Sequence, residues 1–275
     1  MRKNAMLLTF LLFCVLGCVS YTEVPRLELP EVRADETVIT YSGYSDISYG
    51  QAAAGFTQDP SKVAFSVSYD SDLKLPRWVA YSLTKEETYG YAKRGGKQFH
   101  QDTRAHIHQA EYYDYKGSGW TKGHMAPAAD FKWSDAAMDD TFNFTNVCPQ
   151  AEALNAGGWS KLENRVRSWA RQFGEVYVVT GPVVGEAVNG AIGNNVTVPD
   201  AFFKALLVCS EGTFQSVAFI MENSDSDQPY TQCSVTVDEL ESIIGVNLFC
   251  GLDKMVGKKG KESVESQVDR HFWGI

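Results

Sequence analysis

Side chains that could do chemistry are concentrated between Trp120 and Arg167. This stretch contains His124 and then, eight residues apart, Asn155 and Glu163. An imidazole can take a proton from water near neutral pH, and an amide oxygen can hold Mg²⁺ while leaving most positions to water. If a strand that carries His124 packs against a helix that begins near Asn155, an imidazole, an amide, a carboxylate and a guanidinium converge. That combination suits hydrolysis of a phosphodiester, because the cationic side chain can bind the phosphate.

Each of these residues also has an ordinary structural interpretation. A single histidine beside methionine and alanine is more often packed in a core, and an asparagine at a helix start is most often an N-cap. A carboxylate and a guanidinium at i and i+4 usually form a solvated pair worth a few tenths of a kcal/mol. Asn146 and Gln150 would normally bond to loop backbone. His106 and His108 have no further ligand at metal-binding spacing, so we expect them at the surface.

Five segments have the alternation or β-branched composition that predicts strands. They are residues 63–69, 77–84, 175–184, 201–209 and 214–223. The last two are joined by the short connection Ser-Glu-Gly-Thr, which favours a hairpin.

Three segments predict helices. Residues 157–173 repeat apolar side chains at steps of three and four. Residues 236–245 open with a capping box and close at a glycine, and residues 134–142 predict a short helix. Since strands and helices follow no βαβα rhythm, the sequence predicts an α+β domain with a largely antiparallel central sheet flanked by helices.

The first residues resemble an export signal. Arg2 and Lys3 precede an apolar run, Met6 to Leu16, that is short for a permanent membrane span. The run ends in Val-Leu-Gly-Cys18, which resembles a bacterial lipobox, although ordinary cleavage shortly after it is the alternative. We therefore expect a signal peptide at residues 1–18, a tether and irregular extension at 19–60, and a folded domain at 61–275.

Charge and cysteine usage restrict the kinds of site. The net charge of −9 differs from the basic footprint of a nucleic-acid binder, so a phosphate site would have to be a local positive patch. Beyond the signal, Cys148, Cys209, Cys233 and Cys250 remain, and an oxidising compartment would permit disulfides among them without the sequence choosing a pairing. The absence of a CxxC pair argues against a structural zinc site.

Two segments, KGHMAPAADF and FTNVCPQAEALNAGGWSKLE, resemble the DNA/RNA non-specific endonucleases in content, order and spacing. These ββα-metal enzymes include secreted bacterial nucleases and mitochondrial endonuclease G. The residues that match the family motifs are Gly123, His124, Ala126, Pro127, Asn146, Pro149, Gln150, Leu154, Asn155, Trp159, Leu162 and Glu163. PRWVAYSLT resembles the early strand of the family and SVTVDELESIIGVNLF its C-terminal helix, so the resemblance covers roughly residues 65–252.

The resemblance implies an α+β fold with a ββα-metal motif, and hydrolysis of DNA and RNA to products that carry a 5′ phosphate. It implies that His124 is the general base and that Asn155 is the one direct ligand of Mg²⁺, or of Mn²⁺ or another divalent cation. Asn146, Gln150 and Glu163 would orient His124 and the surroundings of the metal. Contacts would go mainly to the phosphate backbone, which carries no sequence information.

The basic residues of the site depart from the family pattern. Where the family has Asp-Arg before Gly-His, this chain has Thr121-Lys122. Lys122 keeps the positive charge but cannot make a bidentate fork to phosphate. Thr121 lacks the carboxylate but is still expected, like Asn146 and Gln150, to lie around the metal ligand. If the carboxylate normally fixes the geometry of the site, Glu163 is the candidate for that orienting role. The expected catalytic residues are His124, Lys122, Glu163 and Arg167, and the expected phosphate-binding residues are Lys97, Lys122 and Arg167.

Two classes of function fit the sequence. The first is an exported, Mg²⁺-dependent nuclease for DNA and RNA, located in a bacterial envelope as a lipoprotein or secreted. The second is a surface lipoprotein that keeps the fold but only binds nucleic acid or a partner, which the net charge of −9 and the Thr121-Lys122 substitution motivate. A third hypothesis, a nuclease toxin delivered to competing cells, requires a cognate neutralising protein, which the sequence of one chain does not contain. Membrane contact is expected only through an N-terminal lipid anchor, and a homodimer stays open.

Overall fold

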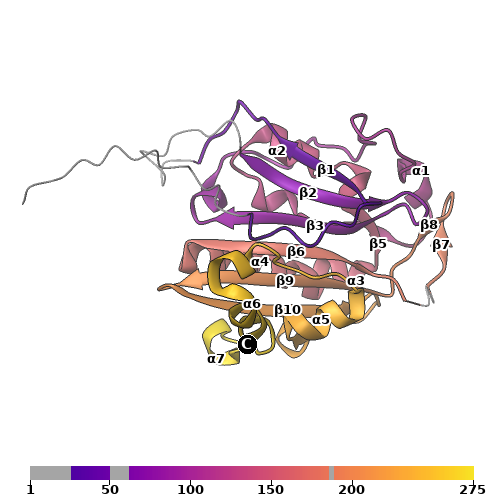
Figure 1. Cartoon of the computed structure of the whole chain (residues 1–275). Coiled ribbons are helices and arrows are strands. Elements are labelled where there is room, and N and C mark those ends of the chain that lie inside the picture. Colours follow the sequence, from indigo (N-terminus) through magenta and orange to yellow (C-terminus); the bar gives the residue numbers. More distant parts are fainter. Residues whose placement is uncertain (1–25, 50–61, 186–188) are drawn as a thin grey trace, which may run out of the picture.

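A seven-stranded antiparallel sheet forms the centre of the protein (Figure 1). The computed structural model describes residues 26–49, 62–185 and 189–275. Along the sheet the strands follow the order β1-β2-β3-β6-β9-β10-β11, and each neighbouring pair is antiparallel. The strands are β1 (Thr37–Ser42), β2 (Val63–Asp70), β3 (Leu75–Thr84), β6 (Glu175–Val183), β9 (Ala201–Ser210), β10 (Thr213–Glu222) and β11 (Ser234–Val235). This arrangement confirms the predicted α+β class and the five predicted strands.

Alternation along the strands buries both faces of the sheet. In β9, Phe202 and Leu206 belong to one hydrophobic core, whereas Phe203 and Leu207 belong to a second core. Successive side chains of a strand point to opposite faces, so the two cores lie on opposite sides of the sheet. The sheet therefore needs a helical layer on each side.

Helices supply these two layers. The longest helices are α4 (Ser160–Phe173), α5 (Val237–Ile244) and α6 (Leu252–Glu265). Leu162 and Val166 of α4 pack into the first core, and Val237 and Leu240 of α5 pack into the second. In Figure 1, α5 and α6 lie in front of β9 and β10.

The remaining elements are short. They are β4 (Thr121–His124), β5 (Val147–Gln150), β7 (Ala191–Ile192), β8 (Val196–Thr197), α1 (Tyr112–Tyr115), α2 (Asp135–Asp140), α3 (Glu152–Leu154), α7 (Arg270–Trp273), the 3-10 turns η2 (Glu86–Tyr89), η3 (Ala128–Asp130), η4 (Phe144–Asn146) and η6 (Tyr230–Gln232), and the π-helical turn η5 (Asn155–Trp159).

Local sequence signals set several element ends as predicted. The β9–β10 hairpin turns at Glu211 and Gly212, whose φ angles of 50° and 78° fit a two-residue primed turn. Helix α2 follows Ser134, whose hydroxyl oxygen accepts a hydrogen bond from Ala137 N at 2.9 Å. Helix α5 carries the predicted capping box at Thr236 and ends at a left-handed glycine.

Helix α6 has no counterpart among the predicted helices. Gly257, with φ 73° and ψ 163°, kinks it, and Gly260 also lies within its span, so the apolar pattern is interrupted and the segment lacks a helical signature. No helix in the described ranges combines the length and the apolar character that a bilayer span requires.

Part of the predicted N-terminal extension belongs to the fold. Leu27 is buried, and β1 pairs with β2 over its whole length, so the described part of the predicted tether and extension packs against the domain and contains a strand. The pairing satisfies backbone groups that an unstructured tether would leave to water. The predicted signal at residues 1–18 lies outside the described residues, and the division of the chain at residue 61 stays a prediction.

The four cysteines beyond the predicted signal do not pair. Cys148, Cys209, Cys233 and Cys250 are all free thiols, and Cys148 is buried in β5. The disulfides that the sequence permits are therefore not formed.

Candidate active site

The chain forms a strand pair followed directly by helical turns at the predicted site. Strands β4 and β5 are antiparallel, with Thr121 opposite Gln150 and His124 opposite Val147. Shortly after β5, the chain enters α3, passes through the π-helical turn η5, and continues into α4. This is the ββα arrangement that the sequence predicted, and π-helical turns are frequent at functional sites.

A cavity of about 370 Å³ lies where these elements meet. Four of the predicted site residues line it, namely Lys122, His124, Asn155 and Glu163. It is also lined by Ala92, Arg94, Pro127, Ala128, Ala129, Lys132, Met138, Ala156 and Ser160. Sequence segments 30 or more residues apart therefore bring an imidazole, an amide oxygen, a carboxylate and cations to one hollow.

His124 is buried beside two aromatic rings. Its ring centroid lies 5.1 Å from that of Phe99 and 4.9 Å from that of Phe142. Among the described residues, Nε2 has no hydrogen-bond partner. Burial, with a smaller contribution from the positive charge of Arg94, lowers the pKa of His124 to about 3. The imidazole is therefore neutral at pH 7 and can accept a proton.

Thr121 fixes the orientation of the Asn155 side chain. The Thr121 hydroxyl donates its hydrogen to the Gln150 carbonyl oxygen at 2.7 Å, and its oxygen accepts from Asn155 Nδ2 at 2.9 Å. A hydroxyl has only one hydrogen, and that of Thr121 is already donated to Gln150. The hydroxyl oxygen can therefore only accept a hydrogen bond from Asn155, which must come from the NH₂ group of the amide. Asn155 Oδ1 is left without a hydrogen bond from the described residues, on a side chain that lines the cavity. The N-cap interpretation of Asn155 is wrong, because Asn155 lies inside the helical run from α3 into η5 and its side chain bonds to Thr121.

Asn146 holds the backbone that follows His124. Its Nδ2 donates to the carbonyl oxygens of Ala126 and Thr141, both at 2.9 Å, and its Oδ1 accepts from Ala126 N at 2.9 Å. The side chain is fully buried and does not line the cavity. Asn146 therefore acts on the site by fixing the loop, as its ordinary structural interpretation has it.

Gln150 is buried against Gly123, the residue before His124. A Cβ at Gly123 would lie 2.2 Å from Gln150 Oε1, so only glycine fits at this position of β4. Both amide atoms of Gln150 are without a hydrogen-bond partner in the described part of the chain. Gln150, the last residue of β5, does not line the cavity.

Two of the predicted phosphate-binding residues, Arg167 and Lys97, form ion pairs with acidic residues. Arg167 Nη1 pairs with the buried Asp130 at 2.6 Å. Its Nη2 donates to Asn164 at 2.7 Å. Lys97 Nζ lies 3.1 Å from a carboxylate oxygen of Asp135. Neither side chain lines the cavity, so these pairings argue against direct phosphate contact by Arg167 and Lys97, which stays a prediction. The solvated pair between Glu163 and Arg167 is not formed.

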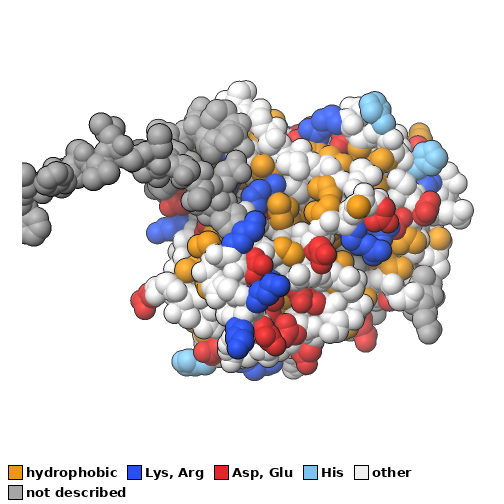
Figure 2. Space-filling view, viewed as in Figure 1, with side chains coloured by type: hydrophobic (Ala, Val, Ile, Leu, Met, Phe, Trp, Pro, Cys, Tyr) orange, Lys and Arg blue, Asp and Glu red, His pale blue; other side chains and the backbone are white. Residues whose placement is uncertain are grey.

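Two basic residues that the sequence analysis did not single out, Arg94 and Lys132, line the cavity instead of Arg167 and Lys97. Arg94 and Lys132 are exposed and line the cavity together with Lys122. Within the described ranges, none of the three has an ion-pair partner. The basic, glycine-rich run Lys-Arg-Gly-Gly-Lys at residues 93–97 is the sequence feature that could have indicated Arg94 as a phosphate-binding residue. Elsewhere basic and acidic side chains are interspersed, as on the face that Figure 2 shows, so the cavity is the local positive patch that an acidic protein needs.

Lys122 stands among three aromatic rings. Its Nζ lies 5.6 Å from the ring centroid of Phe99, 5.1 Å from that of Tyr112 and 5.3 Å from that of Tyr115. Such rings attract a cation by their quadrupoles, while burial lowers the pKa of Lys122. The rings hold the ammonium group at the cavity without neutralising it by a carboxylate.

Glu163 lines the cavity and lies near the buried Lys204. Burial raises the pKa of the Glu163 carboxyl, and the nearby Lys204 opposes this rise. Lys204 is itself fully buried, and its Nζ donates to Thr180 Oγ1 at 3.1 Å and lies 4.7 Å from the Trp159 ring centroid. Among the described residues, Glu163 thus supplies the one acidic group of the cavity lining.

The oxygen donors of the cavity fit a magnesium-like cation. Asn155 Oδ1 is unengaged, and the carboxyl of Glu163 lines the same space. Mg²⁺ retains several waters and needs few protein ligands, so this sparse set suits it. Histidine and cysteine ligands suited to a transition metal are not grouped here in the described residues.

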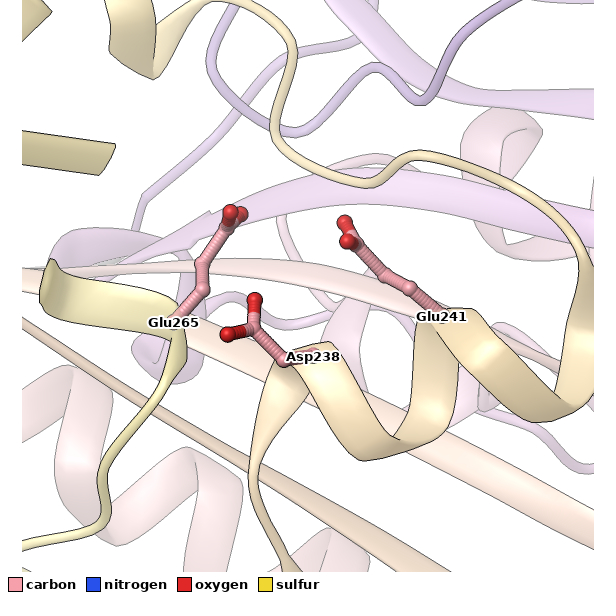
Figure 3. Close-up of side chains that lie close together, drawn as sticks. All are labelled: Asp238, Glu241 and Glu265. Carbon is pink, nitrogen blue, oxygen red and sulfur yellow. The ribbon is translucent and has the colours of Figure 1, made fainter. Parts of the chain in front are cut away.

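A denser acidic group lies elsewhere. Asp238, Glu241 and Glu265, on α5 and α6, bring carboxylate oxygens within 4.8 Å of one another (Figure 3). Lys261 Nζ pairs with Glu265 at 2.6 Å and lies 3.7 Å from Glu241. Lys261 thus supplies a positive charge to this acidic group. Helix α5 packs on the face of the sheet opposite to α4, so the group lies away from the cavity.

The chain is similar to known proteins over most of its length. The family model described as DNA/RNA non-specific endonuclease matches residues 47–255. Mitochondrial endonuclease G of Bos taurus is 34% identical over 206 residues, covering 70% of this chain and 69% of that protein. The mitochondrial nuclease EXOG of Xenopus laevis is 34% identical over 236 residues, covering 79% of this chain and 65% of that protein.

A solved structure shares the fold. The crystal structure of an EndoG/EndoGI complex, described as the mechanism of EndoG inhibition, superposes with a TM-score of 0.64 at 28% identity. The match covers 73% of this chain and 89% of that one.

The comparisons contradict the expected location. Both relatives are mitochondrial proteins by name, which overturns the expectation of a bacterial envelope lipoprotein or a secreted protein. That expectation rested on residues 1–18 alone, where a short apolar run after basic residues resembles several kinds of targeting segment.

We expect His124 of the metal-free protein to remain neutral from about pH 5 to 8, where an unperturbed imidazole would titrate. As the pH falls below about 6.5, the unfolded chain takes up a proton that folded His124 accepts only near 3, so the free energy of unfolding decreases over this interval. NMR of the imidazole resonances, assigned with His124→Gln, measures the titration. A midpoint for His124 between about pH 5 and 8 would contradict the buried, unpaired environment.

Proposed function

We propose, from the premise that the chain belongs to the DNA/RNA non-specific endonuclease family, that its cavity hydrolyses phosphodiester bonds of both DNA and RNA with a divalent cation, Mg²⁺ or Mn²⁺. Membership in the family makes the protein a nuclease, a hydrolase that acts on nucleic acids. One observation carries the assignment of the site: neutral His124 and the unengaged Oδ1 side of Asn155 line the same cavity as three cations without ion-pair partners among the described residues.

His124 is the proposed general base. Its neutral imidazole accepts the proton of the attacking water, a role that requires the unprotonated form. A pKa near 3 would make the isolated group a weak base, but a phosphodiester bound among the cations places a negative charge beside it. An opposite charge nearby favours the protonated imidazole, so the bound substrate raises the basicity of His124.

Asn155 is the proposed protein ligand of the cation. Its Oδ1 faces away from Thr121, and a neutral amide oxygen is a suitable ligand for Mg²⁺. When bound, the cation neutralises charge that develops on the phosphate and on the leaving 3′ oxygen. Glu163 and Gln150 are proposed as positioning residues around this ligand, and Asn146 as the residue that holds the loop after His124.

The phosphate group is proposed to bind Lys122, Arg94 and Lys132. These three cations line the cavity and attract the anionic backbone, which supplies affinity that does not depend on base sequence. Arg167 contributes indirectly, because its bond to Asp130 ties α4 to the segment just beyond His124.

The alternative of a binding protein without turnover loses its main motivation. It rested on the net charge of −9 and on the Thr121-Lys122 substitution. The cations that line the cavity supply a local positive site on the acidic protein, and Thr121 orients the proposed metal ligand through a hydrogen bond. The base, the ligand and the cations of the cavity are all retained.

We expect His124→Ala and Asn155→Ala each to reduce cleavage of plasmid DNA and of RNA by about 10²-fold or more, since loss of a general base costs about 10²–10⁴-fold. EDTA should abolish activity of the wild type, and Mg²⁺ should restore it. His106→Ala is the matched control, because His106 is exposed and does not line the cavity. A wild type that cleaves neither substrate with any divalent cation would refute the proposed reaction.

We expect Thr121→Val to raise the Mg²⁺ concentration for half-maximal activity by about 10–100-fold, the usual cost of losing a residue that orients a ligand. Valine keeps the shape but removes the acceptor for Asn155 Nδ2. Thr121→Ser retains the hydroxyl and should stay near the wild type. Equal Mg²⁺ requirements of the valine and wild-type proteins would show that Asn155 is oriented by other contacts.

We expect Arg94→Ala to raise the KM for DNA about tenfold, whereas Lys97→Ala, three residues away, should change it less than about twofold. A hydrogen bond to a charged group is worth about 1.5–3 kcal/mol, and 1.4 kcal/mol corresponds to tenfold. Steady-state kinetics at one salt concentration measures both variants. A larger effect of Lys97→Ala would restore the phosphate role that its pairing with Asp135 argues against.

A further inference from the structure

Two exposed tyrosines stand beside the cavity. Tyr112 and Tyr113, at the start of α1, have exposed fractions of 51% and 72%. Their rings meet edge to face, with centroids 5.7 Å apart. Large aromatic side chains left in water at the rim of a charged hollow are a typical feature of a binding surface.

Lys122 connects these tyrosines to the cavity. Its Nζ lies 5.1 Å from the ring centroid of Tyr112, and the same side chain lines the cavity with His124. The aromatic surface and the proposed phosphate site are therefore contiguous, and one ligand can contact both.

The turn that carries the tyrosines is held firmly. Glu111 and Asp114 form a reciprocal capping box, and Asp114 Oδ1 accepts a hydrogen bond from Asn194 N at 2.7 Å. Tyr115, the last residue of α1, is buried and stacks on Phe144 with centroids 5.7 Å apart. Because the backbone is fixed on both sides, little conformational freedom remains to be lost when a ligand covers the two outer rings.

We propose that Tyr112 and Tyr113 form a stacking platform for an unpaired base of the substrate strand whose phosphate lies among the cations of the cavity. The inference rests on the proposed function. Of the common partners, nucleic acid combines a dense negative charge, which suits Lys122, with flat π-faces, which suit the tyrosines. Bases in a duplex are already stacked on their neighbours, so the platform favours single-stranded DNA or RNA over a duplex of the same sequence.

Binding in EDTA tests the platform separately from catalysis. Fluorescence anisotropy compares the wild type with the Tyr112→Ala/Tyr113→Ala double variant on a short single-stranded deoxyoligonucleotide, its duplex, and a strand of the same length built from abasic tetrahydrofuran nucleotides. Loss of base stacking should raise the Kd for the single strand about tenfold. The Kd for the duplex and for the abasic strand should change less than about twofold.

The matched control is Tyr112→Phe/Tyr113→Phe, which keeps both ring faces and should bind the single strand as the wild type does. An equal loss of affinity for the abasic strand would overturn the platform, because the tyrosines would then act through Lys122 on the phosphate. An unchanged Kd for the single strand would overturn it as well. Absence of cleavage by the wild type in Mg²⁺ would instead refute the proposed function, since that measurement does not involve the variants.

Discussion

The hydroxyl of Thr121 joins the three elements of the site by two hydrogen bonds. It lies at the start of β4, donates to the carbonyl of Gln150 at the end of β5, and accepts from Asn155 where the helical turns begin. Because a hydroxyl has one hydrogen, the first bond decides the direction of the second. The Asn155 amide must then present its nitrogen to Thr121, which leaves the oxygen unengaged. A neutral side chain thereby orients Asn155 at the position where the family motif has an acid.

Charge is distributed so that the site differs from the rest of the protein. The chain carries a net charge of −9, and several of its basic residues are paired with acidic ones, such as Lys97 with Asp135 and Arg167 with Asp130. In the part of the chain that the structure describes, Lys122, Arg94 and Lys132 form no such pairs, and the cavity that they line has one carboxyl, that of Glu163. An anionic strand is therefore attracted to the place where the proposed base and metal ligand stand, although the protein as a whole repels it.

The sequence predicted the central fold, the pairing of His124 with Asn155 and one cation of the cavity, Lys122, but not the cations Arg94 and Lys132. Alternation and capping residues are local signals, so β9, β10 and α5 could be predicted within about a residue or two. The motif order likewise placed His124 and Asn155 together. Whether a basic side chain is available for phosphate depends instead on which acid it meets in three dimensions. Arg167 and Lys97 meet buried or neighbouring carboxylates, whereas Arg94 does not, and no local pattern distinguishes these cases.

The position of the cation tests the account most directly. Crystals of the wild-type protein soaked in Mn²⁺ and measured where manganese scatters anomalously would locate the ion without any assumption about activity. The account predicts an anomalous peak bonded to Asn155 Oδ1, in the cavity lined by His124. A peak among Asp238, Glu241 and Glu265 with none beside Asn155 would contradict it.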